Sequence, residues 1–191
     1  MKKYSYFTCV LLTISSSVLA FPAKQVLQLS YYDDERVTAQ MPQTPNFMRS
    51  NSDMGVDRGV MGLYEYTLFD VFGAISIHAG ANVGRWHSGP DQIVTGSAFL
   101  SGRLWVFHLL FIHPYVEYSL LGPTLISKEV FSEVGFSSNV LFQNFFGVGV
   151  EVGEGRGFSV DLKTIRYYHT DTLLPQQGFR VPVVASIGVL F

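Results

Sequence analysis

Apolar and polar residues alternate with a period of two along most of the chain after residue 58. The stretch "GAISIHAGANVGRW" shows the pattern most plainly. Its apolar face carries Ile75, Ile77, Ala79, Ala81 and Val83, and its other face carries Ser76, His78, Gly80, Asn82 and Gly84. Successive side chains of a β-strand point to opposite sides, so this period predicts a strand with two chemically distinct faces.

The same alternation recurs in enough segments to predict a closed barrel. The predicted strands fall within residues 26–32, 58–69, 73–86, 93–106, 114–122, 144–152, 158–169 and 181–191. Eight antiparallel strands of about ten residues can close into a small outer-membrane barrel. We therefore predict an all-β fold, an eight-stranded antiparallel up-and-down transmembrane β-barrel, formed by residues 21–191 as one domain.

The lengths of the connections indicate how such a barrel is oriented. The longer polar gaps are 33–57, 127–139 and 170–180, and they alternate with short turns such as "FDVF" and "GEGRG". Outer-membrane barrels have short periplasmic turns and longer outer loops. With periplasmic termini, the longer gaps mostly fall outside, and His169 is expected at the outer rim.

A membrane barrel and a soluble ligand-binding barrel differ in which face of their strands points outward. The apolar face points outward to lipid in the membrane barrel and inward in the soluble barrel. The chain is 48% hydrophobic and 15% charged. The polar face has few charges, and we expect them inside the barrel as paired ions: Glu65, Arg103, Glu117, Glu151 and Arg166. A water-facing wall would be richer in Lys and Glu. The small number of charges on the polar face therefore favours a membrane barrel, with its apolar face outward against lipid.

The first twenty residues, "MKKYSYFTCVLLTISSSVLA", predict a secretory signal peptide that is cleaved after Ala20. Cys9, the single cysteine of the sequence, lies in this segment, so the mature chain has no disulfide or cysteine metal site. Removing Lys2 and Lys3 and no acidic residue takes the formal net charge from -2 to -4. A mildly acidic exported protein is a poor candidate for nucleic-acid binding.

Two details of the last strands bear on the prediction. Counted back from His169 by strict alternation, Lys163 faces lipid, unless a bulge reverses the order or the side chain reaches the interface. The final run places Val181, Val183, Ala185, Ile187, Val189 and Phe191 on one face. A terminal aromatic residue on such a strand resembles the assembly signal of outer-membrane barrels. The alternative is a buried edge strand that ends the chain.

Residues 113–191 resemble the lipid A 3-O-deacylase family of outer-membrane barrels. The resemblance runs from "HPYVEYSLLG" through "LFQNFFGVGVEVGEGRGFSVDLKTIRYYHTD", with Phe142 five residues before Gly147-x-Gly149 and a histidine at a strand end. It implies a serine esterase on the outer barrel wall that contacts lipopolysaccharide. The family motif is His-x-Ser at the end of the seventh strand, with a glutamate at the start of the eighth.

The chain departs from that motif at two of its three positions. His169 matches, but Asp171 stands in the place of the serine and Arg180 in the place of the glutamate. A histidine can act as base toward a hydroxyl two residues along a strand, about 7 Å away. Asp171 and Arg180 do not supply that chemistry. We expect His169, Asp171 and Arg180 to form a remodelled site, with an ion pair between Asp171 and Arg180.

Other interpretations stay open at the level of the sequence. Taken without the resemblance, His169 fits a rim residue without chemistry better than a catalytic base, and the whole chain also fits a non-catalytic barrel that presents its outer loops to a partner. His108 and His113 flank a turn, and we do not expect a metal between them. The run "GVGVEVGEGRG" lacks the lysine and helix of a phosphate loop, so its glycines are expected to relieve crowding inside the barrel. No cofactor is predicted.

Overall fold

The computed structural model describes residues 25–34, 54–132, 134–136, 138–153, 156–169 and 178–191. The predicted signal peptide, residues 1–20, and Asp171 lie outside these ranges. The described strands are β1 (Gln25–Asp33), β2 (Met54–Gly55), β3 (Arg58–Val71), β4 (Ile75–Ser88), β5 (Asp91–Trp105), β6 (Ile112–Ile126), β7 (Val130–Phe131), β8 (Val134–Gly135), β9 (Val140–Val152), β10 (Gly157–Tyr168) and β11 (Gly178–Leu190).

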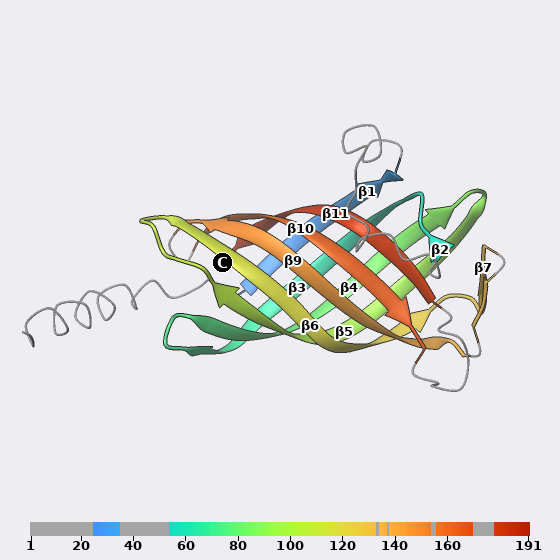
Figure 1. The fold of residues 1–191 in the computed structure, drawn as a ribbon, viewed down its shortest axis with the longest axis horizontal. Helices are drawn as coiled ribbons and strands as arrows, with labels where there is room; N and C mark the ends of the chain where they lie inside the picture. The colour runs from blue at the N-terminus through green and yellow to red at the C-terminus, as the bar shows by residue number, and fades with distance from the viewer. Residues whose placement is uncertain (1–24, 35–53, 133, 137, 154–155, 170–177) are drawn as a thin grey trace, which may run out of the picture.

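The long strands form a closed antiparallel barrel in chain order (Figure 1). The ladder runs β1, β3, β4, β5, β6, β9, β10, β11, and β1 then pairs with β11, from Val26 opposite Leu190 to Tyr31 opposite Ala185. Closure removes the unpaired edges that a membrane barrel cannot expose to lipid. The predicted eight-stranded up-and-down architecture is confirmed, and it includes β1, which the sequence indicated most weakly.

Apolar side chains cover the outside of the barrel wall and buried charged side chains lie on the inside, as in a transmembrane barrel. Leu29, Val83 and Leu120 are each more than 60% exposed on the outside. Glu65 and Glu117 are fully buried inside. A soluble barrel would show the reverse arrangement, because its charged face meets water. The apolar exterior therefore matches hydrocarbon, as predicted from the alternation. No helix in the described residues has the length and apolar character to cross a membrane.

The interior is filled by side chains and divides into two zones. Near the end of the barrel at which β1 begins and β11 ends, a charged network surrounds the guanidinium of Arg103, and Lys163 lies beside it. Toward the opposite end the filling is apolar and aromatic. This cluster includes Trp86, Ile93, Phe131, Tyr167, Phe179 and Val181. An eight-stranded barrel is narrow enough for side chains to pack across it.

Inward glycines make room for these larger side chains. A Cβ added at Gly149 would lie 2.6 Å from the hydroxyl oxygen of Tyr115, and one at Gly147 would lie 2.9 Å from Cγ of Lys163. Both distances are shorter than van der Waals contact. The glycine run of β9 therefore relieves crowding inside the barrel, as the sequence predicted.

The two ends of the barrel differ in their connections. The end that holds the start of β1 and the close of β11, here called the terminal end, has the short turns after β3, β5 and β9. The opposite end, here called the far end, receives the longer connections, including the one that contains the β7–β8 hairpin (Figure 1). This distribution of loop lengths is the one the sequence predicted.

The facing of β10 and the start of β11 differs from the prediction. Lys163 is 1% exposed inside the barrel and does not face lipid, whereas Arg166, expected inside, lies on the outward side between the buried Ile165 and Tyr167. Val181 is buried, and it does not share the outer face of Ile187 and Phe191. The alternation of β10 is unbroken from Ser159 to Tyr167. The facing of Lys163 was predicted wrongly because it was counted back from His169, which lies beyond the end of the strand.

A β-bulge explains the change in β11. Lys163 pairs with Val184 and Ile165 pairs with Val181, so three steps on β11 oppose two on β10. The extra residue lies at Pro182–Val183 and reverses the alternation on its far-end side. Proline at a bulge removes a donor where the ladder is already interrupted.

Candidate functional site

The predicted site residues gather at the far end of β10 and β11. His169 follows the last residue of β10 and is half-buried, and Arg180 is the third residue of β11. The register joins Tyr168 to Gly178 and Arg166 to Arg180, which places His169 and Arg180 at the same rim. Asp171 lies outside the described residues, so its pairing with Arg180 stays a prediction.

Arg180 owes its outward direction to the bulge in β11. Its neighbours Phe179 and Val181 are both fully buried in the aromatic end of the interior, so the side chain between them faces outward. Regular alternation from Val184 would instead have turned Arg180 inward. The bulge thus positions a guanidinium group on the lipid-facing wall.

Arg166 is the residue of this wall that the sequence analysis placed wrongly. It lies directly opposite Arg180 on one side and opposite Asn144 of β9 on the other. All three side chains are half-buried on the outside of the barrel. The unbroken alternation of Ser159, Asp161 and Lys163 was the signal in the sequence that would have placed Arg166 correctly.

Aromatic and apolar groups frame this polar patch. Tyr168 contacts Phe142 with ring centroids 6.5 Å apart on the rim side. On the side of the terminal end, Leu162 and Phe146 are exposed apolar residues. The wall thus changes from hydrocarbon-facing to polar within a few residues of the rim. Aromatic residues at that level are typical of a membrane interface.

The chemistry of the patch is that of binding. Guanidinium groups donate hydrogen bonds and stay protonated at neutral pH, so they supply neither nucleophile nor base. Thr164 Oγ1 donates to the carbonyl oxygen of Val181 at 3.5 Å, next to the bulge. The role of His169 as a base stays a prediction.

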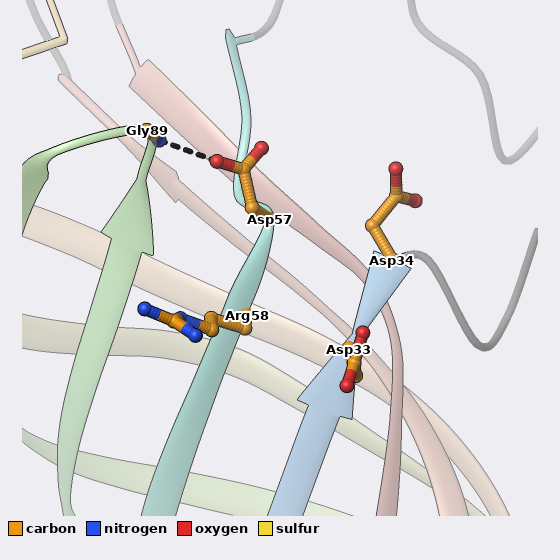
Figure 2. A pocket seen from close by; sticks show the side chains of 5 residues that line it. All are labelled: Asp33, Asp34, Asp57, Arg58 and Gly89. Carbon is orange, nitrogen blue, oxygen red and sulfur yellow. Dashed lines mark hydrogen bonds between the residues drawn. The ribbon is translucent and has the colours of Figure 1, made fainter.

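A separate pocket lies at the far end beside β1 and β3 (Figure 2). It has a volume of about 300 Å³ and is lined by Asp33, Asp34, Asp57, Arg58 and Gly89. Asp57 accepts a hydrogen bond from the amide of Gly89, and Asp34 accepts one from Tyr32 at 3.0 Å. Within the described residues no group of three or more His, Cys, Asp or Glu side chains could hold a metal ion. We assign no metal to this pocket.

The far-end hairpins are tied together at Asp91. Its carboxylate accepts hydrogen bonds from the Lys128 ammonium and from the amide of Ser132, the latter at 2.9 Å. The hydrogen bond from Lys128, with those from the backbone amides, lowers the pKa of Asp91 to about 2. This contact fastens the segment that carries β7 and β8 to the β4–β5 hairpin.

The fold of this chain is similar to that of a solved outer-membrane protein. No family model matches the chain, and no curated protein sequence matches it. The crystal structure of the outer-membrane enzyme PagL matches with a TM-score of 0.58 and 13% sequence identity, covering 87% of this chain and 99% of that chain. At this identity the likeness shows the fold: the chain has the same kind of eight-stranded barrel as a known outer-membrane enzyme.

Proposed function

We propose that this protein is an outer-membrane barrel that contacts lipopolysaccharide through the outer wall at its far end. The surface is of the lipid A deacylase type, with its ordinary serine hydrolysis altered or lost. The predicted signal peptide supports export. The outer membrane is the compartment in which a barrel with an apolar exterior and a charged interior is stable.

One observation carries the proposal. The polar patch of Asn144, Arg166 and Arg180 lies on the outside of an apolar barrel wall, close to the rim and beside His169. Polar groups on that face are costly in hydrocarbon and are favourable where lipid headgroups lie. The fold likeness to PagL, an outer-membrane enzyme, supports a place in the outer membrane, and the choice of lipopolysaccharide rests on the resemblance of residues 113–191 to the lipid A 3-O-deacylase family.

The loss of ordinary hydrolysis follows from the residues at the motif positions. Asp171 offers a carboxylate where a serine esterase needs a hydroxyl, and Arg180 cannot accept the hydrogen bond by which a carboxylate orients the histidine. His169 alone is a base without its nucleophile and its orienting partner.

The test is expression of the full chain in a bacterial host whose outer membrane contains lipid A. Outer-membrane fractions are checked for a folded, heat-modifiable barrel, and mass spectrometry then records both the lipid A species and the lipid that copurifies in mild detergent. We expect insertion, copurified lipopolysaccharide and unchanged acylation. A correctly inserted barrel that retains no lipopolysaccharide would contradict the proposal.

A second experiment asks whether the site keeps its catalytic geometry. The double variant Asp171→Ser with Arg180→Glu restores the motif around His169. We expect a lipid A product smaller by one 3-O-linked acyl chain, and the triple variant that adds His169→Ala serves as the control. If the double variant folds and inserts without any product, the interpretation as a retained site is wrong.

A non-catalytic role in which outer loops bind a partner is the second candidate. The observation that favours it is the β7–β8 hairpin, which forms its own two-stranded sheet beyond the barrel and leaves Val130 exposed. Normal insertion without any bound lipopolysaccharide would favour this role over the first.

A further inference from the structure

We propose that two turns at the terminal end form an apolar anchor that inserts into the phospholipid leaflet on that side of the membrane. They are residues 72–74 between β3 and β4 and residues 106–111 between β5 and β6, here called the anchor turns. They lie at the opposite end of the barrel from the proposed contact with lipopolysaccharide. The inference goes beyond that contact and assigns these turns a partner of their own, the acyl chains of phospholipid.

The tips of the anchor turns carry the most exposed large apolar side chains of the described residues. Phe72 is 85% exposed and Leu110 is 76% exposed. Three further side chains of the second turn, Phe107, Leu109 and Phe111, are each more than half exposed. An apolar surface of this kind marks a place where a protein meets a partner or a membrane.

The backbone conformation at the two tips gives a second, independent observation. Phe72 and Leu110 have φ angles of 57° and 51°, in the left-handed region that favours glycine and asparagine. A bulky side chain in this region costs conformational energy that asparagine would largely avoid. The chain thus places an apolar side chain at each tip in spite of that cost. A favourable contact outside the protein would offset it.

The anchor turns continue the lipid-facing wall of the barrel. The outward residues next to them are Phe69 and Ile75 for the first turn and Leu104 for the second, and all three are exposed and apolar. The turn between β9 and β10 at the same end is different, because its sequence is "GEGR" and Arg156 is exposed. The side of the barrel formed by β3 to β6 is therefore the side that we expect to lie deeper in the leaflet.

Backbone groups of the anchor turns find hydrogen-bond partners within the protein, as insertion into lipid requires. Leu109 and Ile112 exchange two backbone hydrogen bonds, of 3.0 and 2.9 Å. The amide of Ala74 donates to the carbonyl oxygen of Val71 at 3.2 Å, and its own carbonyl oxygen accepts from the amide of Trp105 at 2.9 Å. The last of these bonds also joins the first turn to the end of β5.

Two titratable side chains at these turns direct polar atoms toward the protein as well. The carboxylate of Asp70 accepts a hydrogen bond from the amide of Gly73. His108 Nε2 donates to the carbonyl oxygen of Gly73 at 2.9 Å, and His108 Nδ1 lies 2.9 Å from Nδ1 of His113. These contacts hold the two turns together and leave apolar side chains as their outer surface.

Phospholipid fits this surface better than a protein partner does. A protein interface combines an apolar centre with a rim of polar groups that hydrogen-bond to the partner. The anchor turns present Phe, Leu and Val side chains, and the polar groups described above bond within the chain. Short turns lie on the periplasmic side of outer-membrane barrels, which is the side of the phospholipid leaflet.

The test measures the depth of the anchor turns in phosphatidylcholine vesicles. The full chain with Cys9→Ser carries one nitroxide label, either at Ala74→Cys beside the tip of the first turn or at Arg156→Cys in the polar turn; both positions are exposed. Electron paramagnetic resonance compares the collisions of each label with oxygen, which concentrates in lipid, and with a water-soluble nickel chelate. We expect the label at residue 74 to favour oxygen and the label at residue 156 to favour the chelate.

Two variants show whether the apolar tips set this depth. Phe72→Asn with Leu110→Asn removes both tips and introduces a residue that tolerates a positive φ, so the barrel should keep its heat-modifiable mobility. The label at residue 74 should then shift its preference from oxygen to the chelate. Val130→Asn removes an exposed apolar residue of β7 at the far end and should leave the label at residue 74 unchanged.

Each contrary outcome has a distinct meaning. A label at residue 74 that favours the chelate without the asparagine substitutions would overturn the anchor. Protection from both reagents, together with a dimeric mass in detergent, would assign the surface to a second copy of the chain and also overturn it. An unchanged preference for oxygen in the double asparagine variant would overturn the role of the tips. None of these measurements involves lipopolysaccharide, so the anchor and the proposed function can fail separately.

Discussion

Arg103 is the residue on which the charged interior depends. Its guanidinium donates to Glu65 Oε2 at 2.7 Å and to Glu151, lies 3.5 Å from Glu117 Oε2, and stacks 4.1 Å from the ring centroid of Tyr115. A buried cation among carboxylates is favourable only because its hydrogen bonds offset the loss of hydration. Several groups on different strands are therefore satisfied by one side chain.

Replacing this arginine tests that dependence. Arg103→Met keeps the volume and removes the charge that three carboxylates share, so we expect the free energy of unfolding to fall by about 3–5 kcal/mol. Urea unfolding of the barrel in lipid vesicles would measure the change. The matched variant Arg85→Met, on the exposed outer side, should alter stability by no more than about 0.5 kcal/mol. Equal losses in the two variants would contradict the central role of Arg103.

At the scale of the element, the alternation of the sequence predicted strand positions better than strand facing. Ile77 and Glu117 lie on the predicted sides because β4 and that part of β6 have one clearly apolar and one clearly polar face. Strand β10 has polar residues on both faces, Lys163 inside and Arg166 outside. Its facing is decided by the interior partners of Lys163, and two of these, Gln28 of β1 and Glu117 of β6, belong to other strands.

Bulges limited the prediction for a different reason. The register shift between Lys163 and Ile165 depends on how β11 pairs with β10. The sequence of β11 alone indicates this bulge only weakly, through Pro182. The outward position of Arg180 follows from that shift. The sequence therefore located His169 and Arg180 at the rim, while their role in a site stays a prediction, and the outward facing of Arg166 came from the structure.

A deletion series tests the bulge directly. Removing Pro182 takes out the extra residue and the proline that a regular ladder does not tolerate, so β11 becomes regular while Arg180 stays outward and Val184 inward. We expect this variant to form a barrel with near-normal thermal stability. Removing Ile187 instead breaks a regular segment and reverses the facing of everything on one side of it, which should prevent folding. Heat-modifiable mobility on gels reports both results, and failure of both deletions would contradict the assigned bulge.

For the whole molecule, the orientation of the barrel determines whether the outward polar patch of Asn144, Arg166 and Arg180 meets lipopolysaccharide at all. The far end has the longer connections and the β7–β8 hairpin, and the terminal end has short turns with strongly exposed apolar residues such as Phe72 and Leu110. Outer-membrane barrels place short turns on the periplasmic side. We therefore expect the far end, with Arg166 and Arg180, to face the cell exterior.

Single cysteines can establish this orientation, since the mature chain is expected to contain none. Asn139→Cys marks an exposed position at the far end, and Arg156→Cys marks an exposed position at the terminal end. A membrane-impermeant maleimide added to intact cells should label the first variant at once. It should label the second only after the outer membrane is permeabilised. The opposite pattern would place this patch at the periplasmic leaflet and would contradict its proposed contact with lipopolysaccharide.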